Sequence, residues 1–224
     1  MGIRRDARLA EVLAASEARG RGDRKAPGSN GAWGTVDSRS LRRDKSVPLQ
    51  PVESIGTHVR VLGVDTALRK TGWGIIEING RKITAVDCGV IINPPTSGIC
   101  DCMRRLNNAM KDLIVRYAPD EVAIEGGFYC RNARTAIILG TARGAVLGVL
   151  AEAELPVYEY APRRAKQAVT GRGSATKEQV AAMVSTMLNI QVSNLADDST
   201  DALALAICHG MQRSNPMADM GTLL

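Results

Sequence analysis

Aromatic residues are scarce in this 224-residue chain, which has one Phe, two Trp and four Tyr. Because 45% of the residues are nevertheless hydrophobic, a core large enough for one domain must be built from Ala, Val, Leu and Ile. Histidine is limited to His58 and His209, and the five cysteines include no C-x-x-C pair. The spacing of a zinc site is therefore absent from the sequence, and buried thiols in a reducing cytoplasm are the expected state of the cysteines.

Long hydrophobic runs are also missing. No uninterrupted apolar run approaches the roughly 18 residues of a membrane span, and the N-terminus lacks the apolar core of a secretory signal. We therefore expect a cytoplasmic protein with no membrane partner. The net charge of +6 and pI near 9.3 favour an anionic partner, with nucleic acid first. Residues 1–57 carry 11 Lys/Arg against 7 Asp/Glu, so much of the basic balance lies there.

Three domains of different character are predicted. Residues 1–57 form a basic extension that is polar and Gly-rich after a short amphipathic stretch, "ARLAEVLAASEARG", and we expect most of it to be disordered. It is either an arm that adds non-specific DNA affinity or a segment without a role. Residues 58–212 form the folded domain, and residues 213–224 form a flexible tail.

The pattern of the folded domain is that of an α/β protein. Val- and Ile-rich runs predict three initial strands, with Asn79-Gly80 as a hairpin turn. Helices and strands then alternate, which predicts a mixed five-stranded sheet flanked by helices. The expected strands are 59–64, 71–78, 82–91, 121–125 and 156–160. The expected helices are 101–117, 132–154, 162–169, 176–189 and 198–209, the last closed by Gly210.

Acidic residues end two of the predicted strands. Asp65 follows Val64, and Glu125 closes "EVAIE", so neighbouring strands would bring both to the carboxyl edge of the sheet, where α/β proteins place their sites. In "LADDSTDALALAI", Asp198 and Asp201 are three residues apart and share one face of the helix start. Four carboxylates are therefore expected to converge.

Each acid also has an ordinary structural explanation. Asp198 could cap the last helix and Asp201 could favour its first turn, whereas Asp65 could be a turn residue and Glu125 a strand-end charge. Asp197 is read as a cap or a solvated neighbour. Taken together, clustered carboxylates repel unless divalent cations bind them. Oxygen ligands favour Mg²⁺ or Mn²⁺, and a pair of such ions is the usual apparatus for cutting a phosphodiester.

Several separate motifs now identify a resemblance. The order "LGVD…TGWGII", "APDEVAIEGGFYCRNARTAIILGTARG", "LPVYEYAPRRAKQAVTGRGSATKEQV" and "DDSTDALALAICH" strongly resembles the RuvC family of Holliday-junction resolvases, in the RNase H-like superfamily. The resemblance spans residues 58–210. It implies a homodimer that resolves four-way DNA junctions by paired symmetric nicks in recombination and repair. A branch-migration complex is a further candidate partner.

The resemblance also assigns roles to residues. The family's four metal-binding acids fall on Asp65, Glu125, Asp198 and Asp201, the same set that the pattern selected, with two Mg²⁺ per subunit implied and Mn²⁺ as a substitute. Further positions match residues that would contact DNA or stabilise charge in the transition state: Phe128, Lys166 and Lys177. The family usually follows its first Asp with Pro-Gly, whereas this chain has Thr66-Ala67.

Basic and small residues near these motifs are open to two interpretations. Five arginines either form a DNA-facing surface or are ordinary surface residues: Arg131, Arg134, Arg163, Arg164 and Arg172. Gly140, Gly144 and Gly148 recur every four residues in the long predicted helix, where each costs about 1 kcal/mol relative to Ala. They form a smooth ridge for close helix packing, against a dimer partner or the chain's own sheet. We favour an intrachain role for part of it.

Three alternative functions remain. The first is a RuvC-like module that binds junctions without cutting them, which Thr66-Ala67 keeps open. The second is a nucleotide-binding domain of the actin and sugar-kinase type, whose first strand also ends in Asp before a Gly-containing hairpin, although this chain is short for two such halves. The third is another RNase H-like nuclease, acting on RNA–DNA hybrids or replication forks. Substrate competition and ATP hydrolysis distinguish them.

Overall fold

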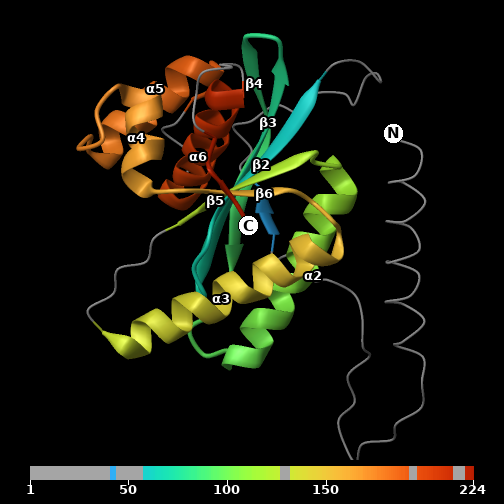
Figure 1. The fold of residues 1–224 in the computed structure, drawn as a ribbon. Helices are drawn as coiled ribbons and strands as arrows, with labels where there is room; N and C mark the ends of the chain where they lie inside the picture. The colour runs from blue at the N-terminus through green and yellow to red at the C-terminus, as the bar shows by residue number, and fades with distance from the viewer. Residues whose placement is uncertain (1–40, 44–57, 127–131, 192–195, 214–219) are drawn as a thin grey trace, which may run out of the picture.

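The computed structural model describes residues 41–43, 58–126, 132–191, 196–213 and 220–224. Within these residues, one mixed sheet lies between two layers of helices (Figure 1). Helices α2 (Ile99–Tyr117) and α3 (Ala133–Glu152) cover one face of the sheet. Helices α4 (Pro162–Thr170), α5 (Lys177–Leu188) and α6 (Asp197–Arg213) cover the other face.

The sheet begins with three antiparallel strands: β2 (Val59–Asp65), β3 (Lys70–Asn79) and β4 (Lys82–Ile92). Asn79 pairs with Lys82, so the predicted Asn79-Gly80 turn is confirmed, and Gly80 adopts the positive φ of 61° that this turn requires. Strands β5 (Glu121–Glu125) and β6 (Val157–Tyr160) then follow, and β2, β5 and β6 run parallel to one another.

Two short strands lie at the edges of the sheet, outside the five that the sequence predicts. Strand β1 (Leu41–Arg43) pairs with β4, and β7 (Thr222–Leu223) pairs with β6, giving the order β1-β4-β3-β2-β5-β6-β7. The predicted α/β class is confirmed, but the strand count of five is corrected to seven. These strands fall in segments expected to be an extension and a tail, where hydrophobic periodicity is too short to signal a strand.

Local sequence signals set the helix boundaries. Asn132 caps α3, because its side-chain oxygen accepts hydrogen bonds from the amides of Arg134 and Thr135. Thr176 and Gln179 form a reciprocal capping box at the start of α5. Helix α2 ends at Tyr117, with Ala118 in the left-handed conformation and a proline immediately after it.

Gly210 does not end the last helix, which is a correction to the sequence prediction. Helix α6 continues to Arg213, and Gly210 is buried inside it. A Cβ at this position would lie 2.9 Å from Cδ1 of Ile78 on β3, so the glycine permits close packing of the helix on the sheet. The local signal of a C-terminal glycine was outweighed by tertiary packing, which sequence periodicity does not report.

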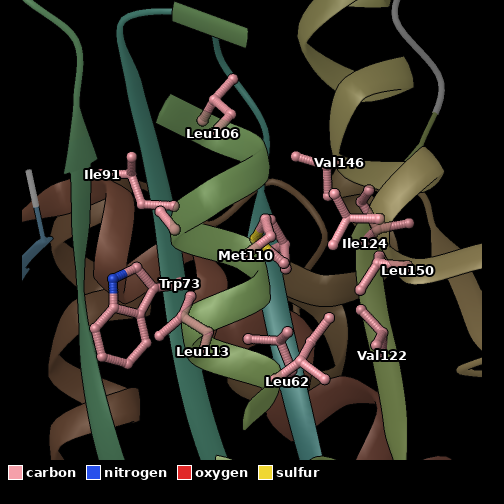
Figure 2. Close-up of a cluster of buried hydrophobic side chains, with 14 of the residues drawn as sticks. Leu62, Trp73, Ile91, Leu106, Met110, Leu113, Val122, Ile124, Val146 and Leu150 are labelled. Carbon is pink, nitrogen blue, oxygen red and sulfur yellow. The ribbon is translucent and has the colours of Figure 1, made fainter. Parts of the chain in front are cut away.

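The core consists of two hydrophobic clusters, one on each face of the sheet. Figure 2 shows the cluster between the sheet and helices α2 and α3, in which Leu62 and Ile124 from the strands meet Met110 and Leu150 from the helices. Aliphatic side chains fill most of this space, as the composition predicts, and Trp73 is its largest member. Burying each such side chain contributes about 1.5–3 kcal/mol, which holds the central strands in register.

Helix α3 has an unusual outer face. Gly140, Gly144 and Gly148 are exposed, and apart from the neighbouring residues and backbone of α3 itself, no described atom lies within 4 Å of a Cβ built at any of them. The expected intrachain role for this ridge is therefore wrong within the described residues. By length and composition alone, α3 could cross a membrane, with 28% of its most apolar stretch buried. A helix packed by one side on a sheet has the same composition, and α3 packs in this way.

Candidate active site

Asp65 and Glu125 are brought together by the pairing of their strands. Strands β2 and β5 are parallel neighbours, and Val64 lies opposite Ile124, so the next residue of each strand is an acid at the same sheet edge. The two carboxyl groups lie close enough for each to shift the pKa of the other. The geometry thus agrees with the sequence prediction that the two strand-end acids meet at the carboxyl edge of the sheet.

Asp198 and Asp201 reach this edge because glycines let α6 lie directly on the strands. A Cβ at Gly72 would overlap the carbonyl oxygen of Asp198, and one at Gly63 would overlap that of Ala202. Gly72 pairs with Asp65 across β2 and β3, so the start of α6 lies over the first acid. The glycines of the "TGWG" motif therefore allow the acidic helix to pack closely on β3. The motif was recognised from the sequence only as part of the family pattern.

The surroundings of these carboxylates oppose their charge. Burial, together with the nearby Glu125, Asp201 and Asp198, raises the pKa of Asp65 to about 8. Burial also raises the pKa of Glu125 and of Asp201, and Lys177 partly offsets it for both. With a pKa of about 8, Asp65 is therefore largely protonated near neutral pH when no cation is bound. A site that retains protons in this way is a site that a divalent cation can occupy in their place.

The two predicted lysines lie beside the acids. Lys177 is the first residue of α5, and its Nζ is 3.5 Å from Oδ2 of Asp201, an ion pair that raises the pKa of the lysine. Lys166 on α4 donates from Nζ to the carbonyl oxygen of Ala175 at 3.0 Å, and its charge lowers the pKa of Asp201. Helices α4 and α5 therefore carry positive charge to the edge at which the carboxylates gather.

The donor set suits a hard divalent ion, although the side chains are not arranged around one. The contributing groups are carboxylates, without a described Cys or His among them, and burial raises the pKa of Asp65, Glu125 and Asp201. Among the described residues, no group of three or more His, Cys, Asp or Glu side chains is positioned to hold a metal as it stands. Asp201 is instead paired with Lys177, which would have to release it. The residues thus fit the metal in the chemistry of their donor atoms.

The Thr66-Ala67 turn is fixed by side chains rather than by a Pro-Gly pair. The hydroxyl of Thr71 donates to the carbonyl of Ala67 at 2.6 Å and accepts from its amide at 3.3 Å. The buried Asn93 donates to the carbonyl of Leu68 at 2.7 Å. Arg69 reaches across to the carbonyls of Pro94 and Ser97. The turn beside Asp65 is thereby tied to the segment that enters α2, so the departure from the family pattern leaves it well anchored.

The predicted DNA-facing residues differ in their surroundings. Arg134, Arg163 and Arg172 are exposed. Arg164 is not, because its guanidinium donates to Gln212 at 2.8 Å and stacks over the ring of Tyr160, so its charge is used inside the fold. Two predicted residues lie outside the described residues: Phe128 and Arg131.

Arg143 is a residue that the sequence analysis missed. It lies on α3 and donates from Nη1 to the main-chain carbonyl of Glu125 and from Nη2 to Oε2 of Glu159 at 2.6 Å. Its charge lowers the pKa of Glu125. The only sequence signal was its place in "GTARG", in the helix that follows Glu125 along the chain. That position does not by itself indicate which way the side chain points.

Comparison with known proteins gives a consistent family. The chain matches the family model described as crossover junction endodeoxyribonuclease RuvC over residues 61–209. A protein of that name from Maricaulis maris is 43% identical over 155 residues, covering 69% of this chain and 92% of the relative. Another, from Halorhodospira halophila, is 44% identical over 158 residues, covering 70% of this chain and 93% of the relative.

Solved structures agree. The structure titled T. thermophilus RuvC in complex with Holliday junction substrate is 31% identical, with a TM-score of 0.67, and the match covers 72% of this chain and 99% of that one. The yeast mitochondrial resolvase Ydc2, at 12% identity and a TM-score of 0.51, shares the fold, over 72% of this chain and 79% of its own. The chain therefore belongs to the RuvC family of crossover junction endodeoxyribonucleases.

Proposed function

We propose that this protein resolves four-way DNA junctions by paired symmetric nicks in recombination and repair, using two Mg²⁺ ions per subunit, for which Mn²⁺ can substitute. The observation that carries the proposal is the convergence of Asp65, Glu125, Asp198 and Asp201 from two strands and a helix at one sheet edge. Relatives named for this activity cover the same folded domain. The protein would act in the cytoplasm.

The proposed roles follow from the positions of the residues. The four carboxylates would hold the metal ions, which would supply an activated water and neutralise charge on the phosphate. Lys177, which is paired with Asp201 in this structure, would neutralise charge on the scissile phosphate when Asp201 serves as a metal ligand. Lys166, anchored on Ala175, holds its charge beside the same edge. No Ser or Tyr is assigned as a nucleophile, so hydrolysis proceeds without a covalent enzyme–DNA intermediate.

The proposed DNA surface combines exposed arginines with residues outside the described part of the chain. Arg163 and Arg172 lie near Lys166 in sequence on α4 and in the connection to α5, and Arg134 starts α3. Phe128 belongs to the proposal through the family match, and Arg131 through its position beside the same motif. We leave out Arg164, since its side chain is bound to Gln212. Such contacts fix the position of the DNA backbone and weaken as salt increases.

A homodimer is part of the proposal, because a four-way junction offers two equivalent strands related by a two-fold axis. The outer face of α3 supports it. Its glycines are exposed and would let another helix approach closely, and Ile137 on the same helix is 68% exposed. A branch-migration complex is proposed as a further partner on the family resemblance only.

The test is a cleavage assay on a synthetic four-way junction with Mg²⁺ or with EDTA, beside linear duplex, a replication fork and an RNA–DNA hybrid. We expect paired nicks that ligase can seal, on the junction only and with metal only. Asp65→Asn should abolish the nicks while leaving junction binding within about twofold of wild type. A wild-type cutting rate in that variant would show that the metal assignment is wrong.

The same assay separates the alternatives. Tight junction binding without nicks in any metal or DNA sequence would favour a binding module, and cutting of the hybrid or fork in preference to the junction would favour another RNase H-like nuclease. ATP hydrolysis in the absence of DNA would favour a nucleotide-binding domain. The "GVDTALRKTGWG" strand and hairpin are common to that class, but the acids on α6 have no role in it.

A further inference from the structure

A charged pair outside the set of four candidate metal-binding acids holds the end of β5. Arg143 and Glu159 come from α3 and β6, and their side chains are only 13% and 30% exposed. Their Nη2–Oε2 distance is 2.6 Å. A buried pair of this kind gains little net stability over apolar side chains, because desolvation offsets the attraction. Stability alone therefore does not account for the presence of this pair beside Glu125.

The pair acts on the backbone of Glu125. Arg143 donates its other nitrogen, Nη1, to the main-chain carbonyl of Glu125, so the guanidinium bridges that carbonyl and the carboxylate of Glu159. On the far side, the amide of Gly126 donates to the carbonyl of Tyr160 at 2.9 Å. The peptide that follows the second acid is thus held from α3 and from β6 at once.

Gly126 is required by this arrangement. A Cβ at Gly126 would overlap Cγ and Oε1 of Glu159, so only glycine lets the glutamate pass and reach Arg143. A glycine after a catalytic acid could serve many purposes, but here the space that it leaves is filled by one partner of the pair. The hydrogen bond from Arg143 to the main chain of Glu125 thus links two sequence motifs, the "EGG" that starts with the last residue of β5 and the "ARG" of α3.

We propose that Arg143, oriented by Glu159, is a positioning residue that sets the direction of the Glu125 carboxylate toward the metal site. The proposal rests on the proposed function, since it concerns the geometry of one of its acids. The bridge fixes the main chain at the point from which the Glu125 side chain leaves. Its two hydrogen bonds go to the main-chain oxygen of Glu125, from Nη1, and to Glu159, from Nη2, so the bridge acts on the main chain at Glu125.

The chain provides a matched control. Arg60 makes the same kind of bridge at the opposite end of β2, where Nε donates to Oε1 of Glu77 at 3.3 Å and Nη1 donates to the carbonyl of Tyr117 at 3.1 Å. Its side chain is 17% exposed, close to that of Arg143. Arg60→Met therefore removes an equivalent bridge with a similar structural cost, away from the acids.

The experiment is a Mn²⁺ titration of the full-length protein by calorimetry, without DNA, for wild type, Arg143→Met, Arg143→Lys, Glu159→Gln and Arg60→Met. We expect Arg143→Met to weaken Mn²⁺ binding by about 10- to 100-fold, the range for partners that orient metal ligands. Arg143→Lys should not restore the affinity, since an ammonium cannot span both acceptors. Glu159→Gln keeps an acceptor oxygen and should lose less than Arg143→Met.

Thermal unfolding separates positioning from stability. Arg143→Met and Arg60→Met should lower Tm by similar amounts, and Arg60→Met should leave the Mn²⁺ affinity within about twofold of wild type. Equal Mn²⁺ affinity for wild type and Arg143→Met, or equal losses for the two methionine variants, would overturn the proposal. A wild-type protein that binds Mn²⁺ but cuts no junction would defeat the proposed function and still leave the positioning role tested.

If wild type bound no Mn²⁺, amide hydrogen exchange at Gly126 would decide. This amide is bonded to Tyr160, so loss of a positioning bridge should speed its exchange in Arg143→Met and not in Arg60→Met. Unchanged exchange at Gly126 would overturn the proposal without reference to metal or DNA.

Discussion

The buried position of Asp65 among other acids disfavours the ionised form of its carboxyl group. Its pKa of about 8, raised by burial and by Glu125, lies well above the 3.8 of a carboxylate in the unfolded chain. The folded protein therefore binds a proton that the unfolded chain releases. The resulting stability is fully present below pH of about 4 and is lost as the pH rises toward 8.

Asp65→Asn removes this dependence. In EDTA, the variant should unfold at a higher temperature than wild type at pH 8, and the difference should shrink as the pH falls toward 4. With Mn²⁺ at pH 8, the order should reverse, because only wild type gains from metal binding. Thermal unfolding across pH measures both effects. Asp197→Asn, at an exposed acid on the same helix start, is the control and should show neither.

The sequence identified the acids because their residue type and spacing carry the information. Asp65 and Glu125 end apolar runs, and Asp198 and Asp201 share a helical face, so both patterns survive without knowledge of the fold. Arg143 was missed, because an arginine in a helix has no pattern that tells whether it points to solvent or bridges two strands. Arg164 was assigned to DNA for the same reason, although it stacks on Tyr160.

At the scale of elements, the close packing of α6 on strands β2 and β3 determines whether the acids meet. Gly72→Ala would force the start of α6 away from β3, since the new methyl group would overlap the carbonyl of Asp198. We expect a loss of about 1–3 kcal/mol in the free energy of unfolding, as for other overpacked sites, together with weaker Mn²⁺ binding. Chemical denaturation and calorimetry measure the two.

Gly140→Ala is the matched control, because no described atom lies within 4 Å of a Cβ there. Alanine in an exposed helix should raise stability by up to about 1 kcal/mol. The two glycine-to-alanine changes should thus have opposite signs. Equal effects would show that the close contact of α6 with the strands does not govern stability.

The outer face of α3 makes a separate prediction at this scale. Gly144→Leu places a large side chain where the described protomer has open space, so the protomer should fold normally. If α3 packs against α3 of a second subunit, the variant should be monomeric and should lose paired nicking. Light scattering over a range of concentrations measures the mass, and Gly144→Ala is the milder comparison. A wild-type monomer would contradict the proposed dimer, and a variant that still dimerises would contradict the placement of its interface on α3.

Element boundaries show how far sequence reasoning extends. Strands β2 to β6 and helices α2 to α6 fall within a few residues of their predicted positions, because alternation and caps are local signals. The exceptions depend on distant contacts. Gly210 continues a helix because Ile78 packs on it, and β7 is a strand because β6 offers it a free edge. A window of sequence contains neither partner.

For the whole molecule, the open question is the basic segment before the folded domain. Most of residues 1–57 lie outside the described residues, but Leu41–Arg43 pair with β4. A chain that starts at residue 41 therefore keeps all of the strands that the structure describes. If the segment is a DNA-binding arm, its removal should weaken binding to junction and duplex alike and reduce the salt dependence of affinity. The cutting rate at saturating protein should stay the same.

Fluorescence anisotropy of labelled DNA across a range of salt concentrations measures this effect. Exchange of Arg4 and Arg5 for Gln in the full-length chain is a milder test of the same charge. Binding curves that coincide for the full and shortened chains at every salt concentration would show that the segment has no part in DNA affinity.

The truncated chain would also gain an optical property. Trp73 is 2% exposed, pairs with Val64 beside the first acid, and lies 5.8 Å from the ring of Tyr117. The sequence has two tryptophans, and the other, Trp33, is removed with the segment. The emission of the shortened protein would then come from one indole in the middle of the core. Unfolding, and any shift of β3 when metal binds next to Gly72, could be followed by intrinsic fluorescence without a label.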